Sequence, residues 1–399
     1  MTMDKKKKES FLFEKLYVSS LILLFLKGYN FFYFWNIHVI LFLSFNILCG
    51  TLLFLYKPCL QQNFQSVVQL GLLSVIYILI SFGGYNINGI IVNVMYGFVF
   101  YFFLLTSASI KKTALNGITK VYAVILTITF VFYVLIVIAK IPFPYQKITF
   151  NAGQYEFNNY RVLLERINGD FSIFFVRFNS LFLEPGHIGV IAVLVLTAND
   201  FDLRKKENIL ILICAICTLS LATYVLLVFV VFYKNLTVKR FKYLVLIGII
   251  FIALFIYFAM KGEGFFYERI VSRLMYRDGQ LVGNNRVSSK FDSFYNSFFQ
   301  TDRCYLGYGA YYSDLNLGPA AGYKAYVVQF GIVGMILIVL LYFFISFKKN
   351  RSVSLLFLVW FLAFLQAAYP LTPTQFIVFT AGVSVIESKG RKLKHDSSC

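Results

Sequence analysis

Acidic residues, histidines and cysteines are all scarce in this chain of 399 residues. Only 14% of the residues are charged, with 18 acidic against 37 basic, and there are three histidines and six cysteines. A water-soluble globule carries many more charges on its surface, so the composition excludes that class. With so few histidines and no cluster of metal-ligand residues, we expect no metal and no other cofactor. The cysteines lie mostly in apolar or lysine-rich segments, which argues against a disulfide scaffold.

Apolar residues are abundant instead. They make up 59% of the chain, and the mean hydropathy is +0.73. We therefore expect an all-α fold, in which residues 1–399 form a single polytopic domain of an integral membrane protein. The net charge of +19 does not indicate nucleic-acid binding, because the lysines lie in short loops between apolar segments. Runs long enough to cross about 30 Å of hydrocarbon lie at 11–27, 35–56, 66–82, 87–107, 121–139, 179–198, 208–233, 243–259, 325–347, 352–369 and 372–387.

The run 208–233 decides the topology. Lys5 to Lys8 place the N-terminus inside the cell by the positive-inside rule. If 208–233 crossed the membrane once, eleven basic residues further along the chain would lie outside. A hairpin of two short helices that breaks near Ser220 to Thr223 returns all of them to the cytoplasm. The charges therefore favour about twelve membrane segments over about eleven, with both termini cytoplasmic. Such a broken span should border a cavity, because its freed backbone groups need polar surroundings.

The same topology places two large loops outside the membrane, at 140–178 and 260–324. The second loop is rich in arginine, whose planar guanidinium group binds phosphate oxygens in pairs and stays protonated. These arginines are Arg269, Arg273, Arg277, Arg286 and Arg303. The first three recur every four residues, which predicts a helix that carries them as one stripe, either on a solvated face or against a substrate. The sequence Gly283-Asn284-Asn285 then ends that helix and places Arg286 on a loop.

The sharpest local signal is the segment from Arg177 to His187. Glu184 is the one carboxylate within the apolar stretch 178–198, and Pro185 suits the first turn of a helix, so Glu184 should lie at the outer mouth of that helix. A carboxylate there needs a partner, and Arg177 or an arginine of the second loop could form a structural ion pair with it. Alternatively, Glu184 takes a proton from a sugar hydroxyl or stabilises a cationic sugar in the transition state. His187 lies on the same helical face and is either a packing residue or a substrate contact.

Taken in order, these residues resemble the O-antigen polymerase (Wzy-type) and O-antigen ligase superfamily of membrane glycosyltransferases. The resemblance covers about 175–335 and rests on spacing as much as on identity. It is carried by Arg177 before Glu184-Pro185, Arg286 in a large external loop, Gly307-Tyr308-Gly309, Tyr323, and Gln329-Phe330-Gly331-Ile332-Val333-Gly334. Ligases of the superfamily have a histidine shortly before this last segment, whereas residues 318–323 here contain none, which favours a polymerase.

The resemblance implies transfer of a glycan chain from undecaprenyl pyrophosphate to the non-reducing end of another lipid-linked repeat unit, in a bacterial inner membrane. Chain-length regulators and flippases are the protein partners it suggests. It implies catalytic roles for Glu184, Arg177 and Arg286. We assign substrate binding to His187, Arg269, Arg273, Arg277, Arg303, Tyr308 and Tyr323. The alternatives are a lipid-linked oligosaccharide flippase, whose cations should lie within the spans, and an O-antigen ligase.

Overall fold

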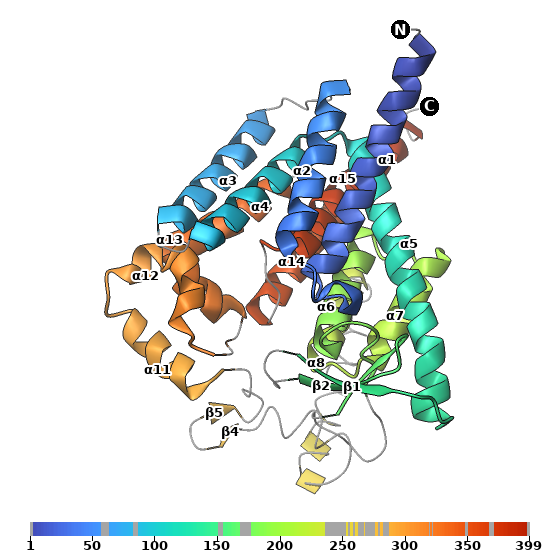
Figure 1. Ribbon diagram of the computed structural model, residues 1–399, viewed down its shortest axis with the longest axis vertical. Helices are drawn as coiled ribbons and strands as arrows, with labels where there is room; N and C mark the ends of the chain where they lie inside the picture. Colours follow the sequence, from blue (N-terminus) through green and yellow to red (C-terminus); the bar gives the residue numbers. More distant parts are fainter. Residues whose placement is uncertain are drawn as a thin grey trace.

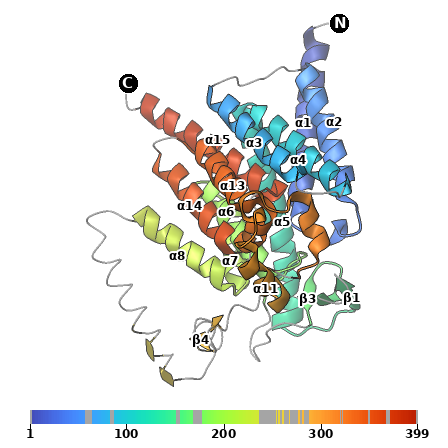
Figure 2. The ribbon, with the colours of Figure 1, turned by 90° about the vertical axis from the view of Figure 1, so that its left-hand side faces the viewer.

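The computed structural model is mostly helical (Figure 1). It describes residues 3–56, 64–82, 87–150, 155–167, 177–235, 287–318, 320, 322–347, 350–366 and 371–396, with a few single residues and residue pairs between 253 and 281. Both termini lie at one end of the helical bundle, and the strands β1 and β2 lie at the opposite end (Figures 1 and 2). We call these the terminal end and the sheet end.

The described helices follow the apolar runs of the sequence closely. They are α1 (Met3–Gly28), α2 (Val39–Tyr56), α3 (Phe64–Phe82), α4 (Ile87–Leu105), α5 (Ala108–Tyr133), α6 (Pro185–Ala198), α7 (Lys206–Cys217), α8 (Leu221–Asn235), α11 (Ser289–Phe298), α12 (Arg303–Leu306), α13 (Gly322–Ile345), α14 (Arg351–Gln366) and α15 (Pro373–Asp396). Short turns of 3-10 helix form η1 (Phe32–Phe34) and η4 (Gly309–Leu315), and a π-helical turn, η2 (Val134–Ile138), extends α5. The predicted run 243–259 lies outside the described residues, apart from three of its positions.

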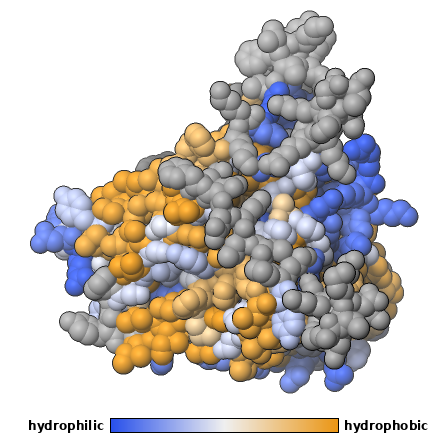
Figure 3. Space-filling model, turned by 90° about the horizontal axis from the view of Figure 1, so that it is seen from above, coloured by the Kyte–Doolittle hydropathy of each residue, from blue (hydrophilic) through white to orange (hydrophobic). Residues whose placement is uncertain are grey.

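Several of these helices suit a membrane. Among the described residues, four are long and apolar enough to cross one: Val39–Tyr56, Ile87–Leu105, Ala108–Ile138 and Gly322–Ile345. Four shorter apolar helices accompany them, at Ser66–Ser81, Pro185–Ala198, Leu221–Asn235 and Arg351–Leu365. Large apolar side chains are exposed on several of the helices, for example Leu48, Leu55 and Phe98, and apolar residues gather on one side of the molecule seen from above (Figure 3). These faces fit contact with lipid; the predicted number of about twelve segments stays a prediction.

The expectation of an all-α fold is wrong for parts of the two large loops. Three strands, β1 (Gln146–Phe150), β2 (Tyr155–Asn159) and β3 (Leu164–Arg166), form an antiparallel sheet in the order β1-β2-β3. In the second loop, β4 (Tyr276–Arg277) pairs with β5 (Gln280–Leu281). Arg277 therefore lies in a strand, and the predicted helical stripe does not reach it. Arg269 and Arg273 lie outside the described residues.

The run 208–233 is two helices, as the charges predicted. α7 ends at Cys217 and α8 begins at Leu221, and Leu219 between them has a φ of 47°, which a helix cannot contain. The break thus comes slightly earlier than the expected Ser220 to Thr223. Both helices pack against α6, on which they form a hairpin.

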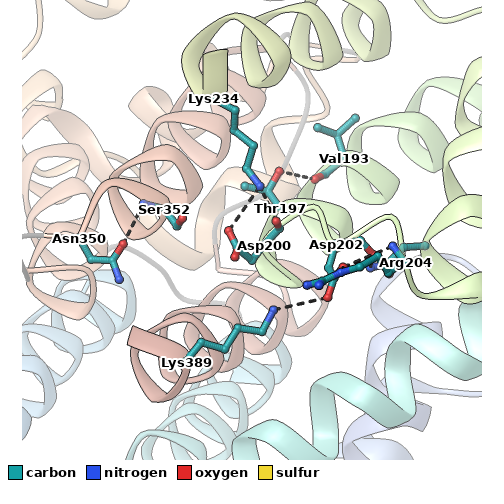
Figure 4. A network of polar contacts seen from close by, with 10 residues as sticks. Val193, Thr197, Asp200, Asp202, Arg204, Lys234, Asn350, Ser352 and Lys389 are labelled. Carbon is teal, nitrogen blue, oxygen red and sulfur yellow. Dashed lines mark hydrogen bonds and ion pairs between the residues drawn. The ribbon is translucent and has the colours of Figure 1, made fainter. Parts of the chain in front are cut away.

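Contacts at the terminal end show that this hairpin returns to its starting side. Lys234, at the end of α8, donates to the backbone carbonyl of Asp200, in the loop before α7, and lies 3.4 Å from its Oδ1 (Figure 4). Lys389 of α15 lies 3.9 Å from Asp202 in the same loop. Lys234 and Lys389, which belong to two basic segments far apart in the sequence, therefore lie at the same end of the molecule. That this end is cytoplasmic stays a prediction.

Helix α6 lies at the centre of the bundle. It packs against α7, α8, α14 and α15, and every one of its residues except His187 is buried. An apolar helix without a polar face needs such an environment. With only 14 residues it is shorter than the predicted run 179–198, because Pro185 starts it. The residue before that proline, Glu184, is therefore placed at the sheet end of the central helix.

Candidate functional site

Glu184 takes the N-cap position of α6 without capping it. Its backbone is extended, with φ −139° and ψ 138°, because the proline that follows disfavours the helical region. Its side chain makes no capping hydrogen bond and is 23% exposed. The carboxylate accepts a hydrogen bond of 2.7 Å at Oε1 from the hydroxyl of Tyr155. The chain thus presents a half-buried, oriented carboxylate where the positive end of the helix dipole favours the ionised form.

His187 lies one helical turn beyond Glu184. Its Nε2 is 3.7 Å from Glu184 Oε2, and its side chain is 29% exposed. The distance is longer than a hydrogen bond, so the pair interacts chiefly by charge when the imidazole is protonated. This separation agrees with the prediction that the two residues lie on the same helical face, while the role of His187 stays a prediction.

The sheet supplies the hydroxyl that orients Glu184. Tyr155 stacks on Phe157, its neighbour on the same face of β2, and the guanidinium of Arg166 lies 4.9 Å above the Tyr155 ring. Burial, helped by a hydrogen bond to Glu165, raises the pKa of the nearby Tyr160 hydroxyl above its usual range, so this group stays a donor.

Sequence reasoning missed Tyr155 and Arg166, although a signal was present. The segment 146–159 has two runs rich in Ile, Thr, Phe and Tyr around Asn151-Ala152-Gly153-Gln154, a pattern typical of a β-hairpin.

Arg177 lies at the break between α7 and α8. Its Nε donates a hydrogen bond of 3.0 Å to the carbonyl of Thr218, and the next residue, Phe178, donates its backbone N–H to the carbonyl of Cys217. Carbonyls at the C-terminus of a helix have no partner within the helix. Arg177 therefore satisfies the interrupted backbone of α7, a contact that differs from the expected ion pair with Glu184.

The other predicted substrate residues fall into a separate group or outside the described chain. The guanidinium of Arg303 lies 5.7 Å from the centre of the Tyr308 ring, and that ring packs against Phe294 and Phe298. The three rings belong to, or pack against, a second, smaller apolar cluster formed by Phe291, Phe298, Cys304, Leu317 and Val328. Tyr323, near the start of α13, packs against the main core. Arg286 lies outside the described residues.

The glycine motif of the second loop, at Gly307, contacts the glycine motif of α13, at Gly331. Helix α13 is kinked at Gly331, which has φ 67° and ψ −179°, so the predicted span 325–347 is not straight. A Cβ added at Gly331 would lie 2.2 Å from the carbonyl oxygen of Tyr305, and one added at Gly307 would lie 2.3 Å from that of Gln329. Tyr308 also donates its backbone N–H to the carbonyl of Val328 at 3.0 Å. These glycines therefore hold the loop against the kink and touch no ionisable group of the Glu184 site.

Within the described residues, no group of three or more His, Cys, Asp and Glu side chains could hold a metal ion. Around Glu184 the structure brings together an oriented carboxylate, the imidazole of His187, and the guanidinium of Arg166 above the Tyr155 ring. No protein-family model, no curated protein and no solved structure matches the chain.

Proposed function

We propose that this protein is a Wzy-type polysaccharide polymerase. It transfers a glycan chain from undecaprenyl pyrophosphate to the non-reducing end of a second lipid-linked repeat unit, at the outer face of a bacterial inner membrane. Glu184 acts as the general base for the acceptor hydroxyl, and arginines stabilise the pyrophosphate that leaves.

The observation that carries this proposal is the setting of Glu184. A general base must be ionised, oriented and able to reach its substrate. The N-terminus of α6 favours the anion, the Tyr155 hydroxyl fixes Oε1, and the carboxylate stays partly exposed.

Arginines complete the proposed mechanism. Negative charge develops on the leaving pyrophosphate as the glycosidic bond breaks, and prepositioned donors stabilise it most in the transition state. Nε of Arg177 donates a hydrogen bond to the carbonyl of Thr218, and the guanidinium groups of Arg177 and Arg286 bind the phosphate oxygens. Arg269 and Arg273 attract the anionic substrate at longer range.

Substitution of Glu184 tests the proposal, with Glu165 as a matched control. Glu165 lies in the same region and also accepts a hydrogen bond from a tyrosine, Tyr160. Each residue is changed to glutamine in a strain whose own polymerase is deleted. We expect Glu184→Gln to abolish long polymer at near-normal abundance in the membrane, and Glu165→Gln to retain it. Low abundance with normal activity per molecule would reject the catalytic role.

The location of unpolymerised units distinguishes the alternatives. Loss of a polymerase leaves single lipid-linked repeats at the outer face of the membrane, whereas loss of a flippase leaves them at the inner face. Loss of a ligase leaves long lipid-linked chains that are not transferred to the outer core. Digestion of intact cells and of lysed cells with a glycosidase separates the first two outcomes, and gel profiles separate the third.

A further inference from the structure

A cavity of about 480 Å³ lies away from Glu184, at the same end of the molecule. Its wall includes His38 at the start of α2, Asn88 and Asn93 in the first two turns of α4, Tyr312 in η4 and Gln329 in α13. The start of α2 belongs to the sheet end, since Phe32, in the η1 turn just before it, donates its backbone N–H to Leu181. His38 therefore lies at the sheet end, beside Tyr312 of the second large loop.

The chemistry of this cavity differs from that around Glu184. Among the described residues that line it there is no carboxylate, lysine or arginine. Its polar groups are chiefly side-chain amides, each with two donors and one acceptor oxygen. Among the described residues, none forms a hydrogen bond with the amides of Asn88, Asn93 or Gln329. Such groups suit a ligand with many hydroxyls and no charge, whereas a pyrophosphate needs cations.

The glycine motifs build one wall of the cavity. Gly307 lies against the backbone of Gln329, and the kink at Gly331 follows two residues later. The same contact fixes the start of η4, which carries Tyr312. Helix α13 and the η4 turn thus contribute an amide, Gln329, and an aromatic residue, Tyr312, to the wall of one cavity. A sugar offers hydroxyls to the first and C–H groups to the second.

We propose that this cavity binds a neutral saccharide. Its volume lies in the range of small-molecule sites, about 300–1,000 Å³, and would admit a short oligosaccharide. If the proposed polymerase function holds, on which this second step rests, the bound sugar is a unit of the lipid-linked acceptor other than the one whose hydroxyl Glu184 activates. The anionic pyrophosphate then lies near the arginines. The uncharged sugar lies in the cavity lined by Asn88, Asn93 and Gln329.

Binding of simple glycosides tests the first step without any catalysis. The full chain in lipid nanodiscs is mixed with methyl glycosides of hexoses and N-acetylhexosamines, and saturation-transfer NMR reports the contact. We expect Asn93→Leu and the milder Asn88→Ala to weaken binding about three- to tenfold, the effect of one lost hydrogen bond. Asn36→Leu removes an exposed amide that does not line the cavity, and should leave binding unchanged. Size-exclusion profiles confirm that each variant is folded.

Other outcomes overturn the proposal. Equal glycoside signals from the wild type and both cavity variants would place the sugar elsewhere. Binding of glycerophosphoglycerol but not of glycosides would assign the cavity to a phospholipid headgroup. For the second step, Asn93→Leu should raise the acceptor concentration at half-maximal rate while kcat stays near normal. Glycoside binding that depends on Asn93, together with normal polymer from Glu184→Gln, would retain the cavity site and reject the polymerase mechanism.

Discussion

Among the residues that the structure describes, two apolar stretches are interrupted, between α7 and α8 and inside α13, and different groups satisfy the two interruptions. The first uses the side chain of Arg177, which donates to the carbonyl of Thr218. The second uses close backbone contact between Gly331 and the segment around Tyr305. The first reverses the direction of the chain, while the second only bends it.

This difference explains which interruption the sequence reveals. A reversal changes the side on which every later loop lies, so it leaves a trace in the basic residues of those loops. A bend keeps both ends of the helix on their original sides and leaves no such trace. The only local sign of the kink is Gly331 itself, and glycine is common in membrane helices.

The largest effect is expected at the kink. Gly331→Ala and Gly307→Ala each place a Cβ within 2.4 Å of a backbone oxygen, at φ values of 67° and 72°. Backbone cannot move aside as a side chain does, so we expect each change to cost about 3 kcal/mol or more. Thermal unfolding in detergent measures this. Gly71→Ala in α3, where an added Cβ meets no atom within 4 Å, is the control and should unfold as the wild type does.

If Gly331→Ala unfolds normally, the close contact with Tyr305 is not a feature of the folded protein. The position of Gln329 in the wall of the cavity would then no longer be supported. Unfolding of both alanine variants at the wild-type temperature would therefore count against the kink and against the placement of Gln329.

Most helices could be predicted because hydropathy reports length and position together. The start of α6 could be predicted from Glu184-Pro185, and the hairpin from charge. The sheet β1–β3 could not be found in the same way, since its strands are short and its partners are set by tertiary contacts. For the same reason Tyr155, which orients Glu184, was missed: its role depends on a hydrogen bond across 29 residues.

The residues of the second loop show a further limit. Spacing every four residues predicted a helix through Arg277, which lies in β4 instead. A four-residue period among charged residues says little when no apolar stripe accompanies it. The glycine motifs were recognised as part of the resemblance, but their mutual contact needs three dimensions to be seen.

A smaller effect is expected where the hairpin packs on α6. A Cβ at Gly189 would lie 1.8 Å from Oγ1 of Thr223, so Gly189→Ala pushes α8 away and should cost about 1–3 kcal/mol. Thr223→Gly in the same chain should restore part of that loss. Gly117→Ala is the control, because its Cβ would meet only the end of the flexible Ile22 side chain. The unfolding temperatures of these variants in detergent measure the effect. Failure of the double variant to recover would mean that small residues are not what allows the hairpin to pack.

The smallest effect on stability is expected at the first interruption, where a side chain rather than the backbone makes the contact. Arg177→Lys keeps the charge but loses the Nε donor, and one hydrogen bond to a backbone carbonyl contributes about 1 kcal/mol. Arg204→Lys is the control, since its side chain is 91% exposed and such surface pairs contribute little.

Polymerisation should respond more strongly than stability to Arg177→Lys, because a lysine cannot donate to two phosphate oxygens in the arginine geometry. At matched protein levels, we expect Arg177→Lys to lose most of the polymer and Arg204→Lys to retain all of it. Gel profiles of the polysaccharide and unfolding temperatures of the purified variants are compared directly. Near-normal polymer from Arg177→Lys but none from Arg177→Ala would show that position 177 contributes only a diffuse positive field. A normal unfolding temperature for both variants would show that the break between α7 and α8 does not depend on this side chain.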